Sequence, residues 1–335
     1  MRRRTLVLVS AIVLGLTACT SGHSESDSST AVRGSSTGSV ARTTSSEATT
    51  TTPASTSSKP TTPRTTPPTT QPTGGLQLPR GGVTLLPNYR IVAYYGAPGN
   101  PGLGVLGKGT PDQAADAIEE RAAQYRPYGR PVQPAMELIA TVAQGSAGAD
   151  GDYSAPVSME AVQKYLDAAH RHKMLLVLDF QPGRGDFLPQ VKQFSRFLTD
   201  PSVGVALDPE WKVGPTQKPA QVIGHASAAS INAVSAYLSA LVTARHLPQK
   251  LFVVHQFTLR MLPDRQNILG HKQLATVFHA DGHGSIPSKQ AVYAALNFPR
   301  TAGAGFKLFL REDAKLMTPA QVMALPRRPD LVTYQ

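Results

Sequence analysis

The stretch Val203–Trp211, VGVALDPEW, is the most informative segment of the sequence. Small and apolar residues run without interruption and are followed by two carboxylates, Asp208 and Glu210, two positions apart. Such a run predicts a buried parallel strand, and Pro209 must mark its end because proline cannot donate to a strand ladder. Alternate residues of an extended chain point to the same face, so we expect both carboxylates on one side.

Segments of this kind recur throughout residues 83–335, with helical patterns between them. Several helices have clear starting signals, such as Thr110, Pro111 and Gln113, which together predict a capping box. Besides the strand that begins at Val203, we predict strands over residues 90–96, 132–142, 174–181, 250–257, 274–281, 304–310 and 330–335. Eight alternations in about 250 residues predict an α/β fold with a closed parallel sheet, a (β/α)₈ TIM-like barrel. An open doubly wound sheet is the alternative.

The beginning of the chain has the pattern of an export signal. Arg2–Arg4 precede the apolar run Thr5–Leu16, which is too short to span a bilayer comfortably and therefore predicts a signal peptide over residues 1–18. Leu16–Cys19, LTAC, resembles the lipobox of bacterial lipoproteins. This resemblance implies an exported protein, anchored to the outer face of the cell membrane by a lipid on Cys19. An ordinary signal with an incidental cysteine is the alternative.

Residues 19–82 are dominated by serine, threonine, proline and glycine. This composition buries too little apolar surface to offset the entropy of ordering, so we predict a disordered linker that spaces a barrel domain of residues 83–335 from the membrane. The formal net charge is +11, but dense Lys/Arg runs with interleaved aromatics do not occur in the sequence. An exported chain with this pattern is not expected to bind nucleic acid, and we predict no protein partner.

Polar residues recur at the ends of the predicted strands, where barrel enzymes place their active sites. Because a buried carboxylate without a partner is costly, the recurrence predicts a shared polar cavity. Asp208 and Glu210 are the predicted catalytic pair, and Asp179 and Glu137 are further catalytic carboxylates. The predicted ligand-binding residues are Tyr94, Tyr95, Gln181, Trp211, His255, Gln256, His279, Asp281 and Lys307. Alternatively, Asp208 caps a turn, Glu210 is solvated and Trp211 is a packing residue.

The Asp-x-Glu-aromatic pattern at 208–211 is similar to the end of the signature of chitinase-like barrel glycosidases, and to the Asp-x-Glu of some barrel lysozymes. The resemblance implies that Glu210 is the general acid and that Asp208 orients it or assists a substrate acetamido group. Val203 and Ala206 stand where the chitinase signature has two further aspartates. Over the whole domain, segments such as YYGAPGNPGLGVLG, ALDPEW and VVHQFT resemble an uncharacterised family of exported bacterial barrel proteins, which implies no activity.

Three other patterns have competing interpretations. GLGVLG at 102–107 matches a dinucleotide fingerprint, but residues 97–101 separate it from its strand and 108–109 delay the helix. His255, His279 and Asp281 suggest a metal-dependent hydrolase as a third hypothesis, although we predict no metal and no cofactor. Lys307 either binds an anionic substrate group or pairs with Asp281 or Glu137.

The leading hypothesis is a surface-tethered lipoprotein with a glycoside-hydrolase-like barrel that acts on cell-envelope or environmental glycan. The runner-up is a non-catalytic glycan-binding lipoprotein of the cell envelope. The aromatic content of 6% favours the runner-up, because sugar subsites usually offer more stacking surface.

Overall fold

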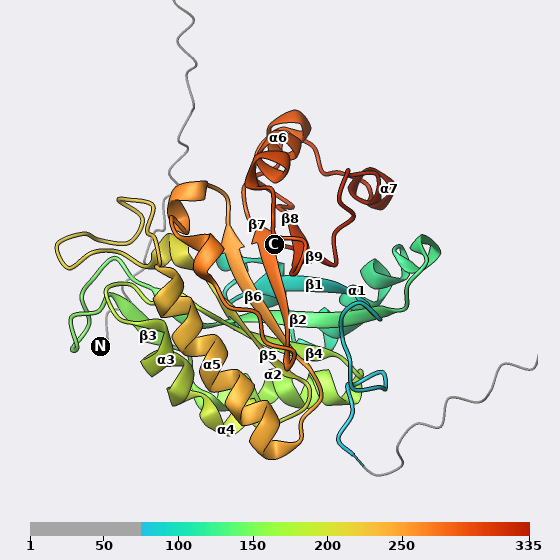
Figure 1. The fold of residues 1–335 in the computed structure, drawn as a ribbon, viewed down its shortest axis with the longest axis horizontal. Helices are drawn as coiled ribbons and strands as arrows, with labels where there is room; N and C mark the ends of the chain where they lie inside the picture. The colour runs from blue at the N-terminus through green and yellow to red at the C-terminus, as the bar shows by residue number, and fades with distance from the viewer. Residues whose placement is uncertain (1–74) are drawn as a thin grey trace, which may run out of the picture. The chain divides into compact units, whose positions relative to one another are not determined.

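A computed structural model describes residues 75–335, which form a closed barrel of eight parallel strands (Figure 1). The strands are β1 (Arg90–Gly96), β2 (Val132–Ala143), β4 (Leu175–Phe180), β5 (Val203–Leu207), β6 (Lys250–Gln256), β7 (Leu274–Ala280), β8 (Gly303–Leu308) and β9 (Leu331–Tyr334). β9 pairs with both β8 and β1, which closes the sheet and excludes the open alternative. β3 (Ser154–Pro156) adds a short antiparallel partner to the end of β2. The predicted (β/α)₈ class is therefore confirmed.

The helices lie between the strands. They are α1 (Pro111–Ala123), α2 (Met159–Arg171), α3 (Phe187–Gln193), α4 (Ser195–Leu198), α5 (Ala228–Arg245), α6 (Ile286–Leu296) and α7 (Pro319–Met323). Short 3₁₀ turns are η1 (Pro101–Leu103), η2 (Val105–Gly107), η3 (Arg126–Tyr128), η4 (Pro209–Trp211), η5 (Leu259–Met261) and η6 (Arg265–Asn267). The capping box of Thr110 and Gln113 is present at α1. Within residues 75–335, the helices are all too short or too polar to cross a membrane.

The strand alternation divides the core into two layers. Outward-facing side chains pack against the helices in the larger hydrophobic cluster. Inward-facing apolar side chains form a second cluster that includes Ala93, Ala135, Val177, Ala206, Val253, Val277 and Leu331. Two residues further along the same strands are Tyr95, Glu137, Asp179, Asp208, His255, His279 and Thr333. The two-residue period of strands therefore places a polar layer directly above an apolar floor, toward the carboxyl ends of the strands.

The glycines of GLGVLG hold the first loop against the end of β1. A Cβ on Gly104 would lie 2.3 Å from the Tyr95 carbonyl oxygen, and one on Gly107 would lie 2.3 Å from the Ala97 carbonyl oxygen. The segment forms η1 and η2, and α1 begins only at Pro111. Close backbone approach therefore accounts for these glycines, in a geometry unlike the direct strand-to-helix turn of a dinucleotide site.

Candidate active site at the carboxyl end of the barrel

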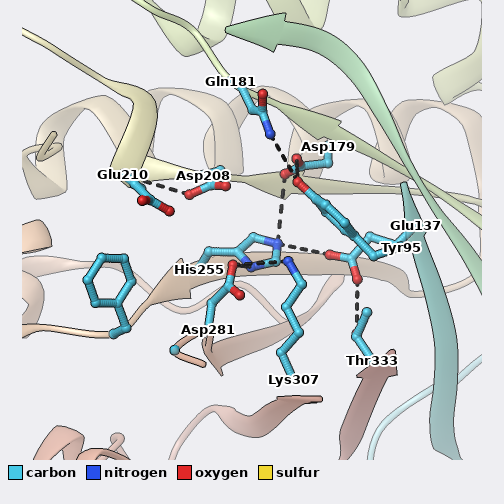
Figure 2. A network of polar contacts seen from close by, with 12 residues as sticks. Tyr95, Glu137, Asp179, Gln181, Asp208, Glu210, His255, Asp281, Lys307 and Thr333 are labelled. Carbon is cyan, nitrogen blue, oxygen red and sulfur yellow. Dashed lines mark hydrogen bonds and ion pairs between the residues drawn. The ribbon is translucent and has the colours of Figure 1, made fainter. Parts of the chain in front are cut away.

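Glu137 lies in the polar layer, and both of its carboxylate oxygens have hydrogen-bond partners (Figure 2). Oε1 is 2.9 Å from His255 Nε2, and Oε2 accepts a hydrogen bond of 2.9 Å from the Thr333 hydroxyl. All three side chains are buried. Thr333 was missing from the predicted site, although the alternation of DLVTYQ would have placed it on the same face as the inward Leu331. Glu137 therefore positions His255 rather than offering a free oxygen to a substrate.

His255 connects Glu137 to a second ion pair. Its Nδ1 lies 2.8 Å from Asp281 Oδ2, and the same oxygen accepts a hydrogen bond of 3.1 Å from Lys307 Nζ. The Lys307 ammonium also lies 3.5 Å from the centroid of the Tyr95 ring, a cation–π contact. Of the alternatives for Lys307, the structure shows the pair with Asp281.

The charges of these groups support one another. Burial would lower the pKa of His255, but Asp281 and Glu137 raise it well above the ordinary value. Burial would raise the pKa of Glu137, but the charge and hydrogen bond of His255 hold it at about 2. Burial likewise opposes ionisation of Asp281, whose pKa is nevertheless lowered by Lys307 and His255. The two cations and the two carboxylates therefore balance in this part of the layer.

Asp179 lies in the same layer as Glu137, but its pKa is shifted in the opposite direction. The Tyr95 hydroxyl donates to Asp179 Oδ2 at 2.8 Å, and Gln181 Nε2 donates to the Tyr95 oxygen at 3.1 Å. Burial raises the pKa of Asp179 to about 8, and the Asp208 charge adds to this although His255 opposes it. Asp179 is therefore mostly protonated at neutral pH, unlike the chemically similar Glu137.

Asp208 and Glu210 lie at the turn that follows β5. Asp208 Oδ1 accepts a hydrogen bond of 3.3 Å from the Glu210 backbone N–H and caps η4, so the predicted strand alternation does not extend to Glu210. The turn-capping alternative is thus correct for Asp208, which is nevertheless buried in the polar layer. Burial raises the pKa of Asp208 to about 6. Partial burial and the charges of Asp208 and Asp281 raise the pKa of Glu210 to about 8.

Exposure distinguishes Glu210 from the other carboxyl groups. Glu210 and the neighbouring Trp211 are partly exposed. The other four carboxyl groups of the layer are buried: Glu137, Asp179, Asp208 and Asp281. Among these five carboxyl groups, Glu210 is therefore the one most accessible to solvent.

Tyr94 and Gln256 are not brought together with the other predicted site residues. Tyr94 precedes the inward-facing Tyr95, and Gln256 follows the inward-facing His255. Strand alternation therefore turns both side chains outward. The Tyr94 ring packs 6.2 Å from the Tyr334 ring, between centroids, and Gln256 Oε1 accepts a hydrogen bond of 2.7 Å from Arg265 Nη1. Both side chains serve packing and hydrogen bonding outside the barrel interior.

His279 is stacked on His255, with ring centroids 5.0 Å apart. A Cβ on Gly305 would lie 2.9 Å from the His279 ring, so the glycine leaves space for this imidazole. Burial and the charge of His255 lower the pKa of His279 to about 3, which keeps it neutral. Among the described residues, neither ring nitrogen of His279 has a hydrogen-bond partner.

Comparison of the chain with models of protein families and with curated proteins finds no match. Since barrels of this class host many unrelated activities, the fold alone does not assign a function.

Proposed function

We propose that the barrel hydrolyses glycosidic bonds of cell-envelope or environmental glycans, with Glu210 as the proton donor. The supporting observation is that Glu210 combines partial exposure at the barrel mouth with a pKa raised to about 8. A general acid must reach the leaving-group oxygen and must hold its proton near the working pH. Glu210 meets both requirements, whereas the other carboxyl groups of the layer are buried.

The neighbouring residues have supporting roles in this proposal. Asp208 fixes the turn that presents Glu210, and its charge favours the protonated form of Glu210. It is the second carboxylate that glycoside hydrolysis requires near the acid. Trp211 lies beside Glu210 and offers an aromatic face on which a sugar ring can stack. Asp179 holds the Tyr95 hydroxyl, which lines the interior below the pair.

The direct test is product release. The purified protein is incubated with a panel of envelope glycans, and the soluble fraction is analysed by mass spectrometry. New oligosaccharides are the expected result. Glycan retention without any release would favour the runner-up function, a non-catalytic glycan-binding protein. Two observations favour this binding function. Four of the five carboxyl groups of the layer are buried, and Val203 and Ala206 stand in place of two aspartates of the chitinase signature.

The pH dependence of the reaction has a defined sign. Only protonated Glu210 can donate, and its pKa is raised to about 8, so activity should be lost as the pH rises through about 8. Replacing Asp208 with Asn should lower turnover, because it removes the second carboxylate. In the residual activity this alkaline limb should move to lower pH, because the charge that favours protonated Glu210 is gone. Profiles of kcat/KM against pH for the two proteins measure both effects. Activity that instead increased through pH 8 would identify Glu210 as a base.

The proposal includes a lipid anchor, which rests on the lipobox resemblance of residues 16–19. Cys19 lies outside the described residues, as do the signal peptide and most of the linker. We expect a Cys19→Ala variant to lose incorporation of labelled fatty acid and to leave the membrane fraction, because Cys19 is the only cysteine available for the thioether bond. Unchanged labelling and membrane association would contradict the anchor.

A further inference from the structure

We propose that Glu137, His255 and His279 form a binding site for a divalent transition-metal ion, with Zn²⁺ as the ion that fits best. Their ligand atoms all lie within 4.8 Å of one another. The three residues project into the barrel from β2, β6 and β7, so the sheet itself holds their separation fixed. Two imidazoles and one carboxylate are a common protein ligand set for Zn²⁺, which takes its remaining coordination from water or a further oxygen.

The unpartnered imidazole of His279 is the strongest sign of a missing partner. The side chain is fully buried, and both ring nitrogens lack hydrogen bonds among the described residues. Leaving a buried polar group unpaired costs about 1–3 kcal/mol, so native proteins rarely do so without a function. His279 also faces His255 rather than a hydrophobic wall. A metal ion bound at the edges of the two stacked rings, by one nitrogen of each imidazole and by a Glu137 oxygen, would give His279 the partner it lacks.

The surrounding charge favours a cation. Five carboxyl groups lie in or beside the polar layer, and Lys307 is the one lysine or arginine among the residues labelled in Figure 2. Asp179 Oδ1 has no hydrogen-bond partner and lies 3.8 Å from His255 Nε2, beside the proposed site. An ion that replaced the proton of His255 would leave Glu137 and Asp281 with Lys307 as their remaining cationic partner, so its positive charge would restore the balance. Asp179 would have to give up its proton to serve as a fourth ligand.

Asp281 forms an ion pair with His255 on the side of the ring where metal-binding histidines usually have an outer contact. Its Oδ2 lies 2.8 Å from His255 Nδ1, the nitrogen that faces away from the proposed ion. A carboxylate in this position fixes the ring orientation and increases the basicity of the ligating nitrogen. The ion would take the place of the proton now shared between His255 Nε2 and Glu137 Oε1, so one proton would be released from this contact on binding.

The test uses the full chain, purified without a polyhistidine tag, stripped with chelator and titrated with Zn²⁺ by calorimetry and elemental analysis. We expect one tightly bound Zn²⁺ per chain. His279→Gln should weaken binding by more than about 100-fold, since even outer-shell changes cost about 10–100-fold. His283→Gln is the matched control, because His283 is exposed and close in sequence. The Zn²⁺ affinity of His283→Gln should equal that of the parent.

Two outcomes would overturn the site: a parent protein that binds no Zn²⁺, or equal binding by the parent and His279→Gln. If His279→Gln fails to fold, the visible spectrum of the Co²⁺-loaded parent decides. Intense bands of a four- or five-coordinate ion support the buried site, and the weak spectrum of a six-coordinate ion refutes it. The measurements use no glycan, so their result is independent of whether the proposed hydrolysis is correct.

Discussion

Glu210→Gln is expected to reduce glycan hydrolysis by about 10²- to 10⁴-fold, the usual contribution of a general acid. Glutamine keeps the size of the side chain but has no proton to donate at the leaving group. Glycan affinity should remain within a few-fold of the parent, because the shape of the mouth and Trp211 are unchanged. Turnover and binding are measured separately, by mass spectrometry of products and by calorimetry.

The same variant should remain folded. The pKa of Glu210 is raised in the folded protein, so between the ordinary carboxyl pKa and about 8 the folded state binds the proton more tightly than the unfolded state. This group therefore reduces stability as the pH rises through that window. Glutamine removes the effect, and we expect a melting temperature at pH 7 at least equal to that of the parent.

Glu120→Gln is the control for this experiment, since Glu120 is an exposed glutamate on α1. It should leave both turnover and stability unchanged. If Glu210→Gln and Glu120→Gln released product equally fast, Glu210 would not be the acid. The proton donor would then have to be sought among the buried carboxyl groups.

Glu137→Ala is expected to lower the free energy of unfolding by about 3–5 kcal/mol, the range for removing one partner of a buried ion pair. His255 would keep its charge in the barrel interior without one of its two carboxylate partners, and the Thr333 hydroxyl would lose its acceptor. Urea denaturation in the presence of chelator measures this effect apart from any metal binding. Glu120→Ala, at an exposed position, should change stability by less than about 0.5 kcal/mol. Equal losses for the two variants would show that the Glu137 contacts contribute nothing.

Most of the fold could be predicted from local pattern. Buried parallel strands are continuous apolar runs, and each predicted strand therefore differs from the observed one by only a few residues at its ends. The stretch FLPQVKQFSRFL (187–198) has the pattern of one continuous helix but is divided into α3 and α4. Phe194 there leaves the α conformation and donates its N–H to the Val191 carbonyl in a tighter turn. Such a break depends on how the buried Phe194 packs, which the sequence pattern does not reveal.

The site was only partly predictable, because the contacts of its side chains depend on which strands are neighbours in the barrel. Alternation shows that Tyr94 and Tyr95 face opposite ways, but only the assembled barrel shows which one faces inward. Glu137 and Asp179 looked equivalent in the sequence. Their pKa values are nevertheless shifted in opposite directions, because His255, 118 residues away from Glu137, bonds directly to that carboxylate. Long-range pairing of this kind has no local signature.

The closure of the barrel by β9 has a consequence for the order of events during synthesis. β9 is the last strand along the chain and pairs with β1, the first. A growing chain that lacks residues 331–334 has two open sheet edges, and Glu137 has no hydroxyl to bond its second oxygen. The polar layer can therefore be completed only after residues 331–334 have been synthesised and β9 has paired with β1.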